Sequence, residues 1–195
     1  MVSDLANDLQ SIRKPLSAAD TAHPTLDELW AWLADVPDPE IPVVSVVDLG
    51  IVRDVAWNED AETAIITVTP TYSGCPATEV IAQQIREELL KRGVKRVELR
   101  VQISPAWTTE WLTTAAKEKL HEYGIAPPAD QVSSTRDAMG ESLTTLGEGA
   151  RKPELACPRC GSMKNEMISR FGSTPCKSLH RCLDCREPFD HFKCH

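Results

Sequence analysis

Apolar residues recur at helical spacing in three stretches of the first 128 residues. These stretches predict amphipathic helices over residues 25–36, 76–92 and 108–123. Thr25 and Glu28 form a capping-box pattern, so we expect the first helix to begin there.

Strand-like patterns lie between these helices. Residues 51–57 and 63–69 are rich in β-branched residues and are separated by a turn at 58–60, which predicts an antiparallel hairpin. Residues 97–103 alternate apolar and polar side chains and predict a third strand. The order α-β-β-α-β-α predicts an α+β fold, a compact three-stranded sheet with helices on one face.

The same patterns divide the chain into four parts. Residues 1–24 have little periodicity and are expected to be a mobile lead-in. Residues 25–128 form the compact domain, and residues 129–153, rich in Ser, Thr, Gly and Pro, are expected to be a linker. Residues 154–195 contain most of the cysteines and predict a small zinc-ribbon-like domain.

Composition narrows the class of protein. The 195 residues carry a net charge of −8, which argues against nucleic-acid binding because phosphate contacts need a basic face. The sequence has neither an apolar run long enough for a membrane span nor the pattern of a secretory signal. We therefore expect a cytoplasmic protein whose thiols are kept reduced.

Six of the seven cysteines lie between Cys157 and Cys194, and four of them form two C-x-x-C pairs. These pairs are Cys157 with Cys160 and Cys182 with Cys185. Two such pairs can surround one ion tetrahedrally, and metal binding can supply the folding free energy that a segment of this size lacks. The pattern predicts a structural Zn²⁺ site; an iron–sulfur cluster and four unrelated reduced thiols are the alternatives.

Other residues of this segment have no assigned role. The histidines and remaining cysteines could form a second weak site or lie on the surface beside the metal fold. They are Cys176, His180, His191, Cys194 and His195. All three phenylalanines also lie here, at positions 171, 189 and 192, and are expected to form a small core.

Cys75 lies at the predicted N-cap of helix 76–92, directly after Gly74. A helix N-terminus stabilises a thiolate, so Cys75 is either a reactive or metal-binding thiol or a small buried residue at a turn. Asp38 and Glu40 lie on a proline-stiffened loop and could supply carboxylates to the same site, or serve only turn and capping roles. The sequence contains no convincing catalytic triad and no glycine-rich phosphate loop.

Several short motifs carry a family resemblance. They are DPEIP at 38–42, VDLGIV at 47–52, TVTP at 67–70, GCP at 74–76 and SPAW at 104–107. Together they resemble the SufT-like family, which is implicated in iron–sulfur cluster assembly. In that family the reactive cysteine falls on Cys75 and the acidic loop on Asp38 and Glu40.

The C-terminal motifs narrow the resemblance. FGSTPCK at 171–177, EPFD at 187–190 and FKCH at 192–195 resemble the PaaD family of phenylacetyl-CoA 1,2-epoxidase systems, which act in aerobic phenylacetate catabolism. The resemblance implies an accessory, non-enzymatic protein. It would help mature the di-iron or iron–sulfur centres of a multicomponent monooxygenase, with the oxygenase and reductase components as partners and iron or an iron–sulfur cluster bound transiently.

Three other functions stay open at this point. The chain could be a structural component that docks on the oxygenase without Cys75 chemistry, a thiol redox protein that uses a C-x-x-C pair, or a zinc-ribbon nucleic-acid binder. Charge disfavours the last, and the ligand-like spacing of the pairs disfavours the second. A homo-oligomer is compatible with the sequence.

Overall fold

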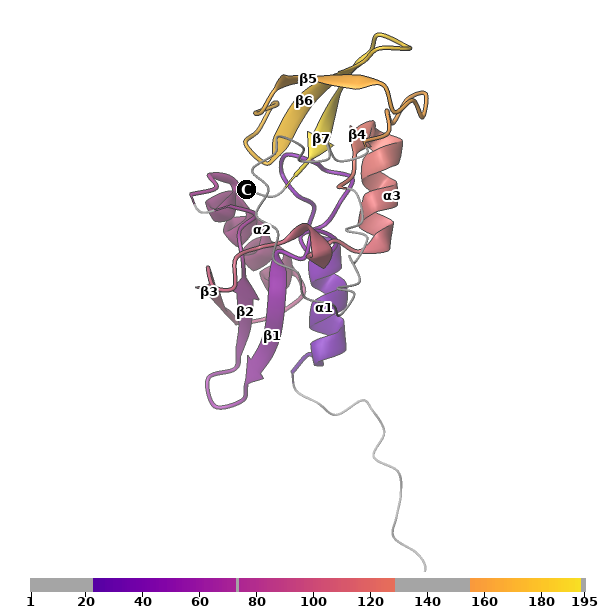
Figure 1. The fold of residues 1–195 in the computed structure, drawn as a ribbon. Coiled ribbons are helices and arrows are strands. Elements are labelled where there is room, and N and C mark those ends of the chain that lie inside the picture. Colours follow the sequence, from indigo (N-terminus) through magenta and orange to yellow (C-terminus); the bar gives the residue numbers. More distant parts are fainter. Residues whose placement is uncertain (1–22, 73, 129–154, 194–195) are drawn as a thin grey trace, which may run out of the picture.

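A computed structural model describes residues 23–72, 74–128 and 155–193 (Figure 1). The expected linker lies outside these residues, as does the expected lead-in apart from His23 and Pro24. We refer to residues 25–128 as the N-terminal domain and to residues 155–193 as the ribbon.

The N-terminal domain is built on a three-stranded sheet with the order β1-β2-β3. The strands are β1 (Val52–Asn58), β2 (Thr63–Val68) and β3 (Arg96–Val101). β1 and β2 form the predicted antiparallel hairpin, in which Val55 pairs with Ile66. β3 runs parallel to β2, so the chain must cross over between them, and it does so through α2 (Ala77–Lys91).

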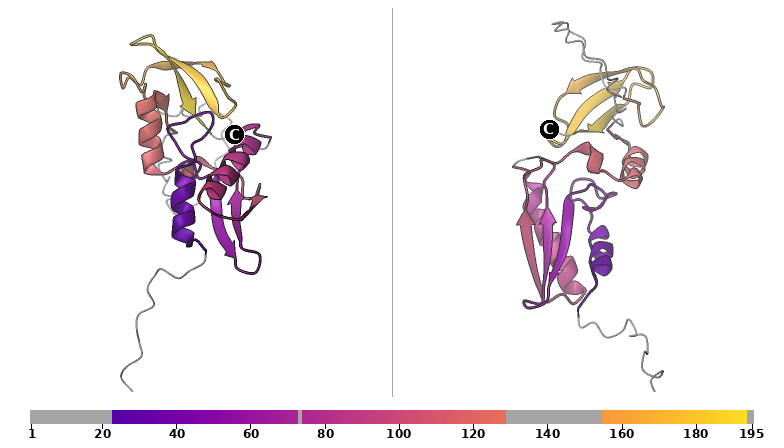
Figure 2. Two further views of the ribbon diagram at one scale, coloured as in Figure 1. Left: turned by 180° about the vertical axis from the view of Figure 1, so that it is seen from behind. Right: turned by 60° about the horizontal axis from the view of Figure 1, so that its bottom comes forward.

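Two helices cover one face of this sheet, as predicted (Figure 2). α1 (Leu26–Ala34) buries Leu29 and Leu33, and α2 packs beside it through Ile81, Ile85 and Leu89. The capping box at the start of α1 is present, because the Thr25 hydroxyl accepts the backbone N–H of Glu28 at 3.2 Å. None of the helices in the described part of the chain has the length and apolar character that crossing a membrane requires.

The prediction of one continuous helix over residues 108–123 is wrong. A 3-10 turn, η1 (Thr109–Trp111), is followed by extended backbone at Leu112 and then by α3 (Thr114–Tyr123). Thr113 causes the break, because its hydroxyl caps the Ala116 N–H at 3.0 Å and its own N–H donates to the Asp48 carbonyl oxygen at 3.0 Å. α3 lies beside the ribbon rather than on the sheet face (Figures 1 and 2).

The ribbon forms a second sheet with the order β4-β7-β6-β5. Its own strands are β5 (Asn165–Ser169), β6 (Lys177–Cys182) and β7 (Pro188–Phe192), paired antiparallel. The fourth strand, β4 (Ile125–Ala126), belongs to the N-terminal domain and pairs parallel with β7. The two parts of the chain therefore share a sheet.

They also share a hydrophobic core. Phe192 is 1% exposed and packs edge-on against Trp107, with ring centroids 5.8 Å apart, while the Trp107 indole N–H donates to the Leu49 carbonyl oxygen at 2.9 Å. Phe189 lies in a smaller core inside the ribbon. Phe171, expected in that core, is instead 59% exposed and lies beneath the Lys193 ammonium group.

Candidate metal centre and thiol cavity

The two C-x-x-C pairs of the ribbon come together in one group, which we call the cysteine quartet. It consists of Cys157, Cys160, Cys182 and Cys185, whose sulfur atoms all lie within 4.8 Å of one another. Two sulfur pairs, each joining one C-x-x-C to the other, are 3.6 and 3.8 Å apart. A tetrahedron of thiolates around Zn²⁺ has edges of about 3.8 Å, whereas a disulfide needs about 2.05 Å, so the spacing fits a four-coordinate metal ion.

Each pair sits on a turn of the same construction. The N–H of Cys157 donates to the Ser162 carbonyl oxygen at 2.9 Å, and the N–H of Cys182 donates to the Glu187 carbonyl oxygen at 3.0 Å. In both turns the residue after the second cysteine has a positive φ, 74° at Gly161 and 67° at Arg186. The two halves of the quartet are thus near-equivalent, and each presents two sulfurs toward the other.

The four sulfurs of the quartet need a bound cation if all of them are to be thiolates. The backbone N–H of Cys185, with that of Asp184, lowers the pKa of Cys182 to about 6 and so favours its thiolate. The Glu187 N–H acts in the same direction on Cys185, but burial and the neighbouring cysteines prevail and raise the pKa of Cys185 to about 12. Four thiolates cannot all be charged at this separation unless a metal ion balances them.

The two turns are tied together outside the quartet. The Ser162 hydroxyl donates to a carboxylate oxygen of Asp184 at 2.6 Å, and Lys164 lies 3.5 Å from the other oxygen of that carboxylate. The Leu183 N–H donates to the Lys164 carbonyl oxygen at 2.8 Å. Such contacts fix the orientation of metal ligands.

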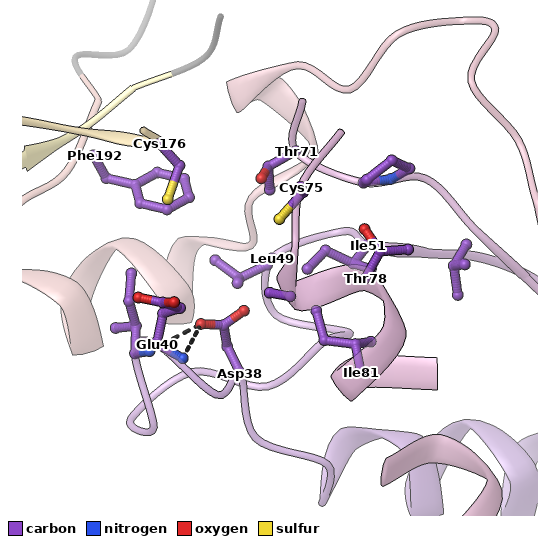
Figure 3. A pocket seen from close by; sticks show the side chains of 14 residues that line it. Asp38, Glu40, Leu49, Ile51, Thr71, Cys75, Thr78, Ile81, Cys176 and Phe192 are labelled. Carbon is purple, nitrogen blue, oxygen red and sulfur yellow. Dashed lines mark hydrogen bonds between the residues drawn. The ribbon is translucent and has the colours of Figure 1, made fainter. Parts of the chain in front are cut away.

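The second group of candidate residues surrounds a cavity of about 30 Å³ at the end of the N-terminal sheet (Figure 3). Asp38, Glu40 and Cys75 all line it, so the structure brings together the three residues that the sequence singled out. Most of the wall is apolar, with contributions from Ile41, Leu49, Ile51, Val68, Ile81 and Phe192. The cavity is large enough for an ion or one or two waters.

Asp38 is 7% exposed, and its two carboxylate oxygens have different surroundings. One carboxylate oxygen accepts the backbone N–H groups of Glu40 at 2.9 Å and Ile41 at 2.8 Å, which is the expected turn chemistry. The second oxygen points toward the cavity (Figure 3). Burial raises the pKa of Asp38, although the two N–H groups act against it. Glu40 lies at the exposed rim.

Cys75 is half-buried and lies one residue before the position that the sequence predicted. The N-cap of α2 is Pro76, and Cys75 precedes it in a turn where its N–H donates to the Tyr72 carbonyl oxygen at 3.2 Å. Burial, together with the neighbouring Cys75 thiol, raises the pKa of Tyr72 to about 12. The phenol is therefore held neutral beside the sulfur.

The ribbon contributes to the cavity as well. Cys176, which has no role in the sequence-based prediction, lines it beside Phe192. Lys177 follows, and its side chain is 6% exposed, with its ammonium group 3.8 Å from Asp190. The positive charge of Lys177 lowers the pKa of both Asp38 and Cys176, against the stronger effect of burial. The FGSTPCK motif is the one sequence signal that could have drawn attention to these residues.

The described histidines of the ribbon do not join the quartet. His180 and His191 both lie against the Ser178 hydroxyl, at 3.0 and 3.3 Å. Burial lowers the pKa of His191 to about 4, so it is a neutral, half-buried group rather than the surface residue expected from the sequence. Cys194 and His195 lie outside the described residues.

Comparisons with known proteins match both parts of the chain. Residues 26–99 match the family described as iron–sulfur cluster assembly protein, and residues 142–193 match the PaaD zinc beta ribbon domain. The Fe-S protein maturation auxiliary factor YitW of Bacillus subtilis (strain 168) is 37% identical over 89 residues, which cover 45% of this chain and 85% of that protein. A crystal structure of a domain of unknown function, DUF59, from Bacillus anthracis has 35% identity and a TM-score of 0.45, covering 48% of this chain and 89% of that one.

A longer match spans both domains at once. An Escherichia coli (strain K12) protein that bears the name of a "Putative 1,2-phenylacetyl-CoA epoxidase" component is 48% identical over 176 residues, which cover 90% of this chain and 97% of that protein. The resemblance that the motifs indicated is thereby confirmed. The chain belongs to the PaaD family of 1,2-phenylacetyl-CoA epoxidase components, with an iron–sulfur assembly domain followed by a zinc ribbon.

Proposed function

We propose that this protein is a non-enzymatic maturation factor that loads iron, as an ion or as an iron–sulfur cluster, into a multicomponent phenylacetyl-CoA epoxidase. The observation that carries the proposal is the joint placement of Cys75 and Asp38 on one small, largely apolar cavity. Both residues, and most of the others that line the cavity, lie in the domain that matches the iron–sulfur assembly family.

The chemistry of the cavity supports iron as the cargo. A thiolate from Cys75 and carboxylates from Asp38 and Glu40 form a mixed sulfur and oxygen donor set, which ferrous iron accepts. The apolar wall limits access of water to the bound iron. Because Glu40 lies at the exposed rim and Cys75 is half-buried, a receiving protein can reach the iron from one side.

In the same proposal the cysteine quartet holds Zn²⁺ as a permanent structural ion. Four thiolates with tetrahedral spacing suit zinc, and their near-equivalent turns leave no open position for another ligand. The partners are the oxygenase and reductase components of the epoxidase, which contain the di-iron and iron–sulfur centres. The protein works in the reducing cytoplasm, and neither site requires it to self-associate.

The test is metal analysis of wild-type protein and Cys75→Ser, purified and reconstituted with iron and sulfide without air. We expect one zinc per chain in both proteins. Iron, with its visible absorption, should be present only in the wild type, and only the wild type should restore epoxidation when added to apo-oxygenase and apo-reductase.

A different pattern would favour a docking function instead. If neither protein binds iron and Cys75→Ser supports epoxidation as well as the wild type, the cavity has no cargo. The protein would then act by binding to the oxygenase alone.

A further inference from the structure

We propose that Cys176 of the ribbon is a second thiolate ligand for the iron at Cys75, so that the iron site is built from both domains. This inference rests on the function proposed above and names a ligand that the motifs around Cys75 do not contain. The iron-binding set would be Cys75, Cys176 and the second carboxylate oxygen of Asp38.

The first argument is the direction of the Cys176 side chain. Its sulfur is not part of the cysteine quartet; it is buried, and it faces the same cavity as Cys75 and Asp38 (Figure 3). Cys176 belongs to the hydrophobic core of the N-terminal domain, although it lies in the other half of the chain. A residue from the ribbon therefore completes the wall of a site in the other domain.

The second argument is that the backbone at Cys176 is held in place. Its carbonyl oxygen accepts the N–H of Lys193 at 3.0 Å, and its sulfur lies 3.0 Å from the Thr174 hydroxyl. The N–H of Gly172 donates to the Lys177 carbonyl oxygen at 2.7 Å. A Cβ at Gly172 would lie 2.5 Å from a carboxylate oxygen of Asp190, so this loop packs directly on β7 and cannot shift without disturbing that strand.

The third argument is charge. Asp38, Cys75 and Cys176 would bring three negative charges to the cavity when ionised. Lys177 is the buried cation beside them, and it is already 3.8 Å from Asp190. A divalent metal ion would balance the remaining negative charge of the three donors.

The shape of the site distinguishes it from a structural metal site. Among the described residues, the quartet is the group whose ligand atoms converge tightly, and the cavity donors do not form a second such group. Three protein donors leave at least one position open on a four-coordinate ion, whereas four thiolates leave none. An open position lets a ligand from a partner reach the metal.

The experiment is anaerobic titration of zinc-loaded, full-length protein with ferrous iron, comparing wild type, Cys176→Ser, Cys75→Ser and Ser178→Ala. Ser178 is a matched control. It is buried and follows Cys176 by two positions in the sequence, but it does not line the cavity. We expect each cysteine variant to weaken iron binding by at least about 10- to 100-fold, the loss that even changes outside the ligands cause. Ser178→Ala should bind iron like the wild type.

X-ray absorption of the iron-loaded wild type gives a second readout that does not depend on folding of a variant. Two sulfur ligands per iron would support the proposal, and one sulfur ligand would overturn it. Zinc content and the far-ultraviolet spectrum of each variant establish that the ribbon is intact.

The outcomes separate this inference from the function on which it rests. If Cys176→Ser binds iron as tightly as the wild type while Cys75→Ser does not, Cys176 is no ligand but the proposed iron cargo stands. If the wild type itself binds no iron beyond the quartet, both proposals fail.

Discussion

The cysteine quartet and the thiol cavity differ in how the chain builds them. The quartet draws its four sulfurs from two near-equivalent turns of one small domain, and they converge within 4.8 Å. The cavity takes one thiol from the N-terminal domain and one from the ribbon, and adds the buried carboxylate of Asp38. Four converging sulfurs on near-equivalent turns suit permanent binding of a metal ion. A site with unlike donors and an open side suits transfer of the ion to a partner.

The comparison also shows that one site depends on the other. Cys176 precedes β6, and Cys182 ends it. Phe192, at the end of β7, lines the cavity and packs on Trp107. The quartet therefore holds the strands that bring Cys176 and Phe192 to the N-terminal domain. Substitutions in the quartet should disturb the cavity, whereas substitutions of the cavity thiols should leave the quartet intact.

The largest effect is expected from Cys182→Ser, which removes a buried ligand of the quartet. Structural zinc supplies on the order of 10 kcal/mol to small metal-dependent folds, so the ribbon should lose both its metal and its folded structure. Zinc analysis and circular dichroism measure this. Cys75→Ser is the control and should keep one zinc per chain; a Cys182→Ser protein that also kept its zinc and ribbon would contradict the structural role.

Phe192→Ala weakens the packing between the two domains and alters the apolar wall of the cavity, but it replaces none of the thiols. Loss of a fully buried phenylalanine should lower the free energy of unfolding by about 3–5 kcal/mol in urea denaturation. Phe171→Ala is a matched control in the same domain: because Phe171 is 59% exposed, its loss should change stability by less than about 0.5 kcal/mol. Equal effects of the two changes would show that Phe192 does not join the domains.

Thr25→Ala tests a position remote from both sites. Losing the N-cap of α1 should cost about 1 kcal/mol of stability, while zinc and iron binding stay unchanged. Thr25→Ser retains the capping oxygen and should restore most of the loss. A change in metal content of the alanine variant would indicate that α1 is coupled to the sites, contrary to the structure.

The smallest effect, and one of opposite sign, is expected from Asp38→Asn. Burial raises the pKa of Asp38, so the folded state favours its neutral form, and that stabilisation is present at low pH and is lost as the pH rises through the folded pKa. Asparagine stays neutral and keeps an oxygen for the two N–H groups. The variant should match the wild type in stability below about pH 4, near the ordinary carboxyl pKa of 3.8, and be the more stable of the two at pH 7.

Denaturant unfolding at several pH values gives this difference directly. At neutral pH the same variant should bind iron more weakly than the wild type, since it lacks the carboxylate charge. A variant that is less stable than the wild type at pH 7 would mean that the charged carboxylate contributes to folding rather than to the cavity's chemistry.

Local patterns predicted most of the secondary structure but not how the domains join. Periodicity located α1, α2 and the β1–β2 hairpin because each depends on neighbours in the sequence. The parallel pairing of β4 with β7 involves two residues, Ile125 and Ala126, which are too few to produce a strand pattern. The break before α3 depends on Asp48, which lies 65 residues away from Thr113.

The same distinction applies to the sites. The quartet was readable from the sequence because its ligands lie in paired C-x-x-C motifs, whose spacing reflects the geometry of one ion. Cys75, Asp38 and Glu40 were found through a loop position and a resemblance. Cys176 was not assigned, since a lone cysteine among metal ligands gives no sign that its side chain faces another domain.

The two ends of the segment between the domains meet at one place. Ala126, at the end of β4, and Leu155, where the described ribbon begins, belong to the same small core. The ribbon is therefore positioned by its contacts with the N-terminal domain, through this core and through the pairing of β4 with β7. An affinity tag or a fluorescent reporter inserted between residues 128 and 142, ahead of the residues that match the zinc ribbon, should leave both metal sites intact and would allow the protein to be followed among its partners.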